Sequence, residues 1–150
     1  MEQVIEAFNR TLYTEGVEEI LVITAYEFLH HPMLRQNDDD FYIPLRLRKG
    51  IRMRSLVSWP GLPDKGAKSE KKFLRQRRFL PEKFTFPGTF YIFGDAVLYF
   101  SASNEEYMAM IIESKAMSQT MRVLHTFMWE ALVEPLNSNA KMSEKQEEVK

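Results

Sequence analysis

Cysteine is absent from this sequence of 150 residues, and histidine occurs only three times. Without thiols the chain has no disulfide scaffold, no cysteine-based zinc ribbon, no iron–sulfur cluster and no thiol catalysis. His30 and His31 are neighbours, so their side chains point in different directions and make a poor metal pair. We expect His125 to be a partly exposed structural residue.

Long apolar runs are also missing. The longest apolar stretches have the length of a strand, well short of the roughly 20 residues that cross a bilayer. The first residues, Met1 to Glu6, lack the basic start and apolar run of a secretory peptide. We therefore expect a cytoplasmic protein that makes no membrane contact.

Familiar catalytic motifs are absent as well. The sequence has no glycine-rich phosphate loop, no Gly-x-Ser-x-Gly elbow and no His-Glu-x-x-His motif. Asp38, Asp39 and Asp40 could supply oxygen ligands, but as helix-capping acids they need no metal. The sequence therefore predicts no catalytic residue, no metal site and no cofactor.

Charge is abundant and unevenly distributed. The whole chain has 20 Lys+Arg and 21 Asp+Glu, a net charge of −1. Residues 41–83 hold 13 of the basic residues and 3 of the acidic ones, a net charge of +10, which leaves −11 on the remainder. Segregation of this size can steer an anionic partner. The alternative is that the basic and acidic elements pair with each other across the fold.

The first half of the chain has the pattern of a strand–helix–strand unit. Apolar residues at helical spacing predict a helix over 1–15, and the β-branched run 20–23 predicts a buried strand. After an irregular stretch at 26–37, the acids at 38–40 are expected to cap a helix that runs to Lys49 and stops at Gly50. The alternative is a helix that begins near Ile43, because Pro44 fits only a first helical turn. The alternating residues 51–57 form a second strand, expected to be parallel to the first.

The second half predicts a meander followed by a helix. A turn-rich loop at 60–66 and a short basic helix at 69–76 precede an edge strand at 77–80. Two aromatic strands flank the turn Gly94-Asp95, and a further strand covers 107–112. A long helix is expected from 115 to 132, and the polar residues 137–150 are expected to form a disordered tail.

Six segments in this order resemble the effector (sensor) domain of TrmB-like transcriptional regulators. They are residues 19–23, 46–54, 77–81, 89–97, 111–115 and 128–129. The resemblance covers approximately residues 5–132. It implies an α/β fold related to one half of the phospholipase D fold, a mixed sheet flanked by helices in a single half-domain. We assign residues 1–136 to this domain.

The catalytic motif of the phospholipase D superfamily can be tested on these residues. That motif is His, any residue, Lys, any four residues and Asp, on the hairpin described above. Aligned on Asp95, the Lys position is Phe90 and the His position is Gly88. Without an imidazole, covalent phosphoryl transfer has no attacking atom. The resemblance therefore implies an inactive motif and a protein that is not an enzyme.

The sequence also departs from the regulator pattern. TrmB-like regulators carry an N-terminal winged helix, whereas only about 18 residues precede the first expected strand. We therefore expect DNA contact only through a separate winged-helix chain or domain, or weakly through the basic segment. The chain is either an isolated effector domain or an unusual stand-alone protein.

Two functions remain open at this point. The first is ligand sensing by a non-enzymatic regulatory domain, which binds a small-molecule effector or a partner and acts through a dimer interface. Open sheets bind ligands at the carboxyl ends of their central strands. The residues expected there are Thr24, Tyr26, Glu27, Ser58 and Trp59, although Tyr26 and Trp59 could instead cap the core.

The second function is binding of nucleic acid or another polyanion by the basic segment 41–83. Attraction to phosphates needs no motif. The candidate residues are Arg46, Arg48, Arg52, Arg54, Arg75, Arg77 and Arg78. The alternative is a solvated face that pairs with acidic helices.

We expect a homodimer, and the resemblance to TrmB-like regulators also favours one. The helices at 1–15 and 115–132 are its expected surfaces, with Met108, Met110, Met117, Met121 and Met128 as adaptable apolar area. The alternative for these methionines is plain core packing.

Overall fold

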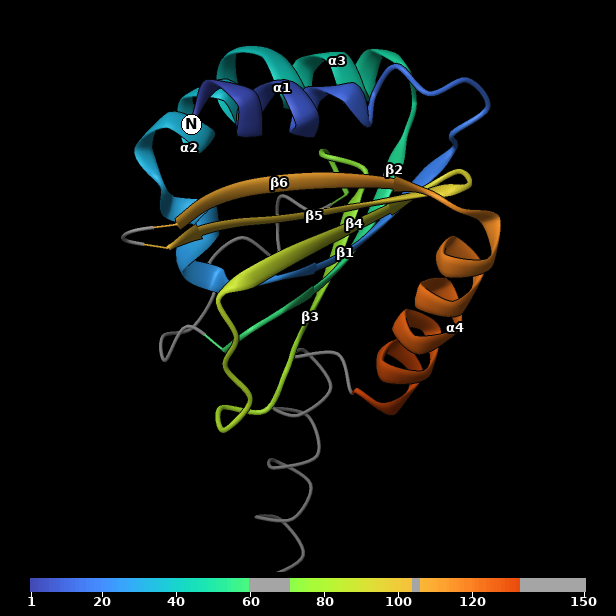
Figure 1. The fold of residues 1–150 in the computed structure, drawn as a ribbon. Helices are drawn as coiled ribbons and strands as arrows, with labels where there is room; N and C mark the ends of the chain where they lie inside the picture. The colour runs from blue at the N-terminus through green and yellow to red at the C-terminus, as the bar shows by residue number, and fades with distance from the viewer. Residues whose placement is uncertain (60–70, 104–105, 133–150) are drawn as a thin grey trace, which may run out of the picture.

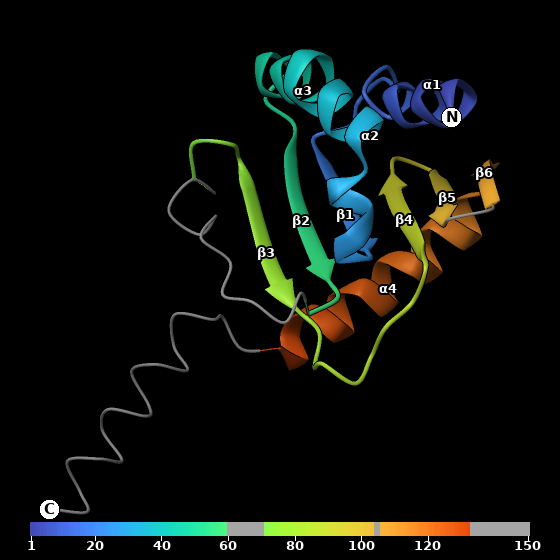
Figure 2. The same ribbon diagram turned by 90° about the vertical axis from the view of Figure 1, so that its left-hand side faces the viewer.

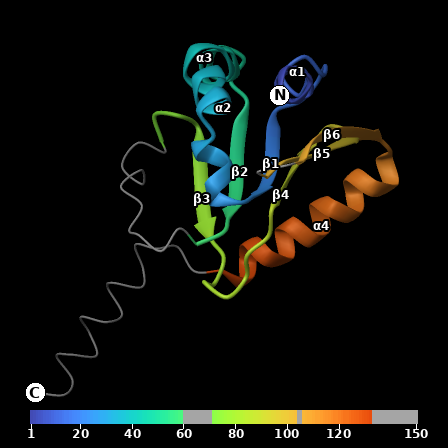
Figure 3. The same cartoon turned by 60° about the vertical axis from the view of Figure 1, so that its left-hand side comes forward.

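A six-stranded sheet lies between two layers of helices in the computed structural model, which describes residues 1–59, 71–103 and 106–132 (Figure 1). The strands are β1 (Glu19–Thr24), β2 (Arg52–Val57), β3 (Arg75–Phe79), β4 (Gly88–Phe93), β5 (Ala96–Ser103) and β6 (Glu106–Glu113). The helices α1 (Glu2–Arg10), α2 (Pro32–Asn37) and α3 (Ile43–Arg48) cover one face, and α4 (Lys115–Ala131) covers the other (Figure 3). The predicted α/β class, with a mixed sheet flanked by helices, is confirmed.

The strand order is β3-β2-β1-β4-β5-β6. β1, β2 and β3 are parallel, whereas β4 pairs with β1 in the antiparallel sense and begins an antiparallel meander that ends with β6 (Figure 2). The parallel pairing of the first two strands and the hairpin around Gly94 are therefore as expected. Gly94 has φ +53, a conformation that glycine adopts without strain.

Alternation along the strands divides the core into two parts. Ile20 and Val22 of β1 face the first helical layer and pack in a large cluster with Val4, Phe8 and Leu12. The intervening β1 residues Leu21 and Ile23 face α4 and form two smaller clusters, which include Ile92, Val97, Leu56 and Trp129. Because successive side chains of a strand point to opposite faces, a continuous apolar run such as residues 20–23 indicates burial on both sides.

The helical region between β1 and β2 differs from the sequence expectation. Residues 26–37, expected to be irregular, form a 3₁₀ helix, η1 (Tyr26–His30), and then α2. Asp38, Asp39 and Asp40 do not cap a helix, because α2 continues through the π-helical segment η2 (Asp38–Tyr42) directly into α3. The wider turn comes just before Pro44, whose missing N–H and ring disturb a regular helix. The cap prediction was therefore wrong.

Two smaller expectations also need correction. Only Glu2–Arg10 of the range 1–15 predicted as a helix is helical, and the residues that follow form turns. The short basic helix predicted at 69–76 is a turn at residues 71–74, and β3 begins at Arg75 because this segment adds an edge strand beside β2. The loop expected at 60–66 and the tail expected at 137–150 lie outside the described residues.

α4 is fixed to the sheet by polar contacts as well as apolar ones. His125 is fully buried, not partly exposed as expected, and its Nε2 lies 3.2 Å from the carbonyl oxygens of Val22 and Arg54. Trp129 stacks on His125, and the guanidinium carbon of Arg78 lies 4.4 Å from the centre of its ring. Arg78 also donates to the carbonyl oxygens of Trp129 and Leu132, at the C-terminal end of the helix.

Burial of His125 makes the stability of this layer depend on pH. Burial, aided by the Arg54 charge, lowers the pKa of His125 to about 4. Between pH 6.5 and 4.5 the unfolded chain binds a proton here and the folded chain does not, so acidification destabilises the fold by about 2 kcal/mol through this group.

We therefore expect His125→Gln, which keeps an N–H donor, to reduce the loss of stability on acidification. The free energy of unfolding, measured by urea denaturation at pH 6.5 and 4.5, should fall by about 2 kcal/mol less in the variant than in the original protein. An equal fall in both proteins would show that His125 is protonated in the folded state.

Candidate functional site

The residues predicted to bind a ligand do meet at the carboxyl ends of β1 and β2. The backbone N–H of Tyr26 donates to Ser58 Oγ at 2.8 Å, and the N–H of Ser58 donates to the Thr24 carbonyl oxygen at 3.0 Å. Thr24 and Thr89 share a hydrogen bond between their hydroxyl groups at 2.9 Å. Thr24 and Ser58 are buried, so these contacts hold the edge closed.

The aromatic members of the same set pack on neighbours. Trp59 is half-buried and meets Phe79 of β3 edge to face, and the Tyr26 ring lies 4.5 Å from the ring of His30. Glu27 is exposed. Ligand binding by this set stays a prediction, and its polar groups are used within the fold.

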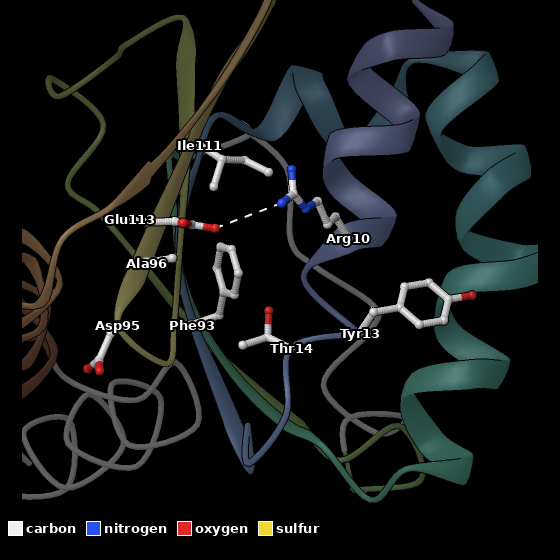
Figure 4. Close-up of a pocket in the computed structure, with 8 residues that line it drawn as sticks. All are labelled: Arg10, Tyr13, Thr14, Phe93, Asp95, Ala96, Ile111 and Glu113. Atoms are coloured by element: carbon white, nitrogen blue, oxygen red, sulfur yellow. Dashed lines mark ion pairs between the residues drawn. The ribbon is translucent and has the colours of Figure 1, made fainter.

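An open cleft lies at the other end of the strands, near the amino end of β1. It has a volume of about 460 Å³, and three separate stretches of chain line it (Figure 4). They are the end of α1 with the turn after it, the β4–β5 turn, and the end of β6. The lining residues are Arg10, Tyr13, Thr14, Phe93, Asp95, Ala96, Ile111 and Glu113.

Polar and apolar groups converge in this cleft. Figure 4 shows the Arg10 guanidinium directed toward the Glu113 carboxylate, with Phe93, Ile111 and the Thr14 hydroxyl around the same space. Arg10 Nη2 and Glu113 Oε1 are 3.8 Å apart, and both side chains are largely exposed. An exposed ion pair at this distance contributes little to stability, so both groups are available to a ligand. Asp95 and Tyr13 point away from the centre (Figure 4).

A second, smaller cavity, partly open to solvent, lies between the sheet and the π-helical segment. Its volume is about 40 Å³. Apolar and hydroxyl side chains of β1 and β2 line it together with charged groups of the helix and of β3. The polar lining residues are Thr24, Asp38, Tyr42, Arg46, Ser55, Arg75, Arg77 and Tyr91.

Arg46 is the most deeply buried charged group in this cavity, with 1% of its surface exposed. Its Nη1 donates to the Ile51 carbonyl oxygen at 2.7 Å, and its Nη2 donates to the Phe73 carbonyl oxygen at 2.6 Å. Its Nε has no hydrogen-bond partner among the described residues. Burial lowers the pKa of Arg46, although guanidinium remains charged at neutral pH.

Asp38 opens the π-helical segment and lines the same cavity. Burial, and then repulsion by Asp39, raise the pKa of its carboxyl group to about 7, against the opposing effect of Arg75 and Arg46. Near neutral pH this carboxyl group therefore carries its proton in about half of the molecules.

Two tyrosines complete the polar lining. Burial raises the pKa of Tyr42 and that of Tyr91, so both stay neutral and keep a hydroxyl proton to donate. The Tyr42 hydroxyl shares a hydrogen bond of 2.8 Å with Thr11.

The arginines predicted to bind a polyanion are in different environments. Arg46 is inside, so it is out of reach of an external polyanion. Arg54 forms an ion pair with Glu19 at 2.9 Å, and Arg78 holds the end of α4. Arg75 and Arg77 line the interior cavity, which leaves Arg48 and Arg52 as exposed members of the set. The alternative prediction, that basic and acidic elements pair across the fold, is met among these arginines by the contact of Arg54 with Glu19.

The hairpin that would carry phospholipase D chemistry is closed at its first position. A Cβ atom at Gly88 would lie 2.5 Å from Cε2 and 2.7 Å from the hydroxyl of Tyr99. Phe90 lies 4.9 Å from Tyr99, ring centre to ring centre, and Asp95 is exposed in the turn. Tyr99 therefore occupies the space that a histidine at position 88 would need.

Over residues 1–59, 71–103 and 106–132, no group of three or more His, Cys, Asp or Glu side chains is arranged to hold a metal ion. In the same part of the chain, no helix combines the length and the apolar character needed to cross a membrane.

Comparison with known proteins gives a structural likeness. No protein-family model matches the sequence, and no curated protein matches it. The fold is similar to that of TrmBL2, an archaeal chromatin protein whose structure shows a novel mode of DNA binding, with a TM-score of 0.58 and 16% sequence identity. The likeness covers 87% of this chain and 50% of TrmBL2, so the chain spans about half the length of that protein.

The open cleft escaped sequence reasoning. Its residues come from positions 10–14, 93–96 and 111–113, which share no motif and no spacing. The rule about carboxyl ends applies to parallel strands, but β4 and β6 run opposite to β1. Their carboxyl ends therefore lie at the amino end of β1, a position that no sequence pattern indicates.

Proposed function

We propose that this chain is a non-enzymatic domain of a transcription regulator that senses a small molecule. The ligand binds in the cleft between α1 and the β4–β5 turn, and the domain communicates with DNA through a separate winged-helix chain or domain. The likeness to TrmBL2 supports a relation to transcription or chromatin regulators at the level of the fold. The cleft is the observation that carries the sensing role.

The cleft has the size and chemistry of a small-molecule site. About 460 Å³ lies within the range of roughly 300–1,000 Å³ that such pockets have. Phe93 and Ile111 offer apolar contact, while Arg10, Thr14 and Glu113 offer a cation, a hydroxyl group and a carboxylate. A small molecule with both a polar and an apolar part matches this lining. Gly88 and Phe90, at the positions where the hydrolase motif has His and Lys, support a role without phosphodiester hydrolysis.

The cleft residues can be tested with a ligand screen. In a thermal-shift panel of sugars, amino acids and nucleosides, we expect at least one compound to raise the melting temperature. Calorimetry should show that Arg10→Ala lowers the affinity for this compound by about tenfold, because a charge-assisted hydrogen bond contributes roughly 1.5–3 kcal/mol to the free energy of binding.

Arg35→Ala is the matched control, since Arg35 is exposed on α2 and does not line the cleft. Its affinity for the compound should equal that of the original protein. A compound that binds equally well to Arg10→Ala and to Glu113→Gln would place the ligand elsewhere and contradict the proposal.

Polyanion binding by the basic segment is the second candidate function. The DNA-binding nature of TrmBL2 and the exposure of Arg48 and Arg52 support it. We expect a labelled DNA duplex to be retarded in a gel at 50 mM salt and released at 200 mM, with weaker retardation by Arg48→Ala/Arg52→Ala. Arg35→Ala again serves as the control. Absence of retardation of the duplex at 50 mM salt would refute this function.

A homodimer through α4 is the proposed route of communication. The helix exposes Val123, Leu124 and Phe127 at 63%, 49% and 72%, three large apolar side chains on one stripe. Of the five methionines predicted to offer apolar area to a dimer, Met117, Met121 and Met128 pack against the core, whereas Met108 and Met110 of β6 are exposed.

Light scattering after size exclusion should detect this dimer. We expect Phe127→Glu to convert it to a monomer, because a buried carboxylate is costly, whereas Lys115→Glu at the start of the helix should leave the mass unchanged. A monomeric mass for the original protein at high concentration would exclude the α4 dimer.

A further inference from the structure

We propose that the interior cavity beneath the π-helical segment η2 is a binding site for a compact oxyanion, of the carboxylate or the phosphate and sulfate type. The site is separate from the open cleft, and the inference does not depend on the sensing role proposed above. It rests on the charge, the donors and the size of the cavity.

The first argument is the buried charge of Arg46. Within the described residues the guanidinium forms no ion pair, and its hydrogen bonds go to neutral backbone carbonyl groups. A buried cation is costly unless an anion or a set of strong dipoles compensates it. The carbonyl groups of Ile51 and Phe73 satisfy two of its nitrogen atoms, but they do not cancel its charge. An anion in the adjacent cavity would do so.

The second argument is the balance of groups around the cavity. Arg46, Arg75 and Arg77 line it together with one carboxyl group among the described residues, that of Asp38. Arg75 and Arg77 also have other contacts, so the charge that calls for an anion is that of Arg46, which the Asp38 carboxyl group opposes only when it is ionised. Four hydroxyl groups line it as well, those of Thr24, Tyr42, Ser55 and Tyr91. Thr24 donates to the Ala25 carbonyl oxygen, and Tyr42 donates to Thr11, whose own proton goes to the Phe8 carbonyl oxygen, so the neutral donors offered to an anion are Ser55 and Tyr91. Guanidinium and hydroxyl groups together form the kind of donor set that recognises oxyanions.

The third argument is size and access. A volume of about 40 Å³ holds about three water molecules, since each needs roughly 10–15 Å³ by this measure. A carboxylate or a tetrahedral oxyanion occupies a comparable space, whereas a sugar or a nucleoside is too large. Asp38, Arg75 and Arg77 are only half-buried, so an ion can reach the cavity between the helix and β3.

Asp38 links binding to pH. An ionised carboxylate would repel the anion, but in its protonated form the group becomes a further donor. The charges of Asp39, Arg75 and Arg46 act most strongly on the pKa of this carboxyl group. The side chains of Tyr42, Tyr91 and Arg77 line the same cavity. Because its pKa is about 7, the fraction of protein ready to bind an anion falls about tenfold between pH 6 and pH 8.

Calorimetry with sulfate and with acetate tests the site, since neither ion changes its protonation between pH 6 and 8. At constant ionic strength set with chloride, we expect one of the two ions to bind and its affinity to weaken about tenfold from pH 6 to pH 8. Sulfate would identify a phosphate-type ligand, and acetate a carboxylate.

Two variants locate the binding. Asp38→Asn should bind the ion at pH 8 as tightly as the original protein does at pH 6, with no pH dependence. Asp40→Asn is the matched control, because Asp40 is exposed in the same segment and does not line the cavity; it should behave as the original protein does. Arg10→Ala should also leave the binding unchanged, which separates this site from the cleft.

The proposal fails under either of two results. If neither sulfate nor acetate binds better than chloride at pH 6, the cavity holds only water. If an ion binds but Asp38→Asn leaves its pH dependence unchanged, it binds outside the cavity. Neither result depends on the stability of an Arg46 variant.

Discussion

The buried guanidinium of Arg46 connects the parts of the fold that chain order leaves apart. It reaches from the end of α3 to the carbonyl oxygen before β2 and to those in the turn before β3. That turn contains Leu74, whose φ of 50 is uncommon for a residue with a side chain, and whose carbonyl also accepts the Met53 N–H. Through these carbonyl groups Arg46 joins α3 to the turn before β3, and it borders the polar cavity beneath η2. Its charge, which has no ion pair among the described residues, is the one that the proposed anion would compensate.

Strand direction decides which edge of the sheet is open. Where β1 and β2 end together, Thr24, Tyr26 and Ser58 satisfy one another and close the edge. At the other edge, the ends of β4 and β6 meet the turn after α1 and leave the cleft. A fully parallel sheet would bring the carboxyl ends of all its strands to one side. The antiparallel meander transfers part of the surface suited to binding to the opposite side.

The basic segment supports the fold as well as offering charge to a partner. Arg54 and Arg78 both lie over the Trp129 ring, and Arg46 is interior, so a net charge counted along the chain overstates the charge available outside. Cationic side chains can pack on an aromatic ring and donate to carbonyl groups at a helix end, and both kinds of contact stabilise packing. The contact of α4 with the sheet depends on this set, together with the buried imidazole of His125.

The sequence by itself determined the α/β class, the two-sided burial of β1, the parallel pairing with β2 and the hairpin at Gly94. These features follow from local periodicity and from turn chemistry, which neighbouring residues define. It could not place the helix start at Pro32, the burial of Arg46 and His125, or the meeting of residues 10–14, 93–96 and 111–113. Those outcomes depend on contacts between distant segments, because burial and pKa are properties of the assembled surroundings. Only the tertiary structure therefore decided where the cleft and the polar cavity lie.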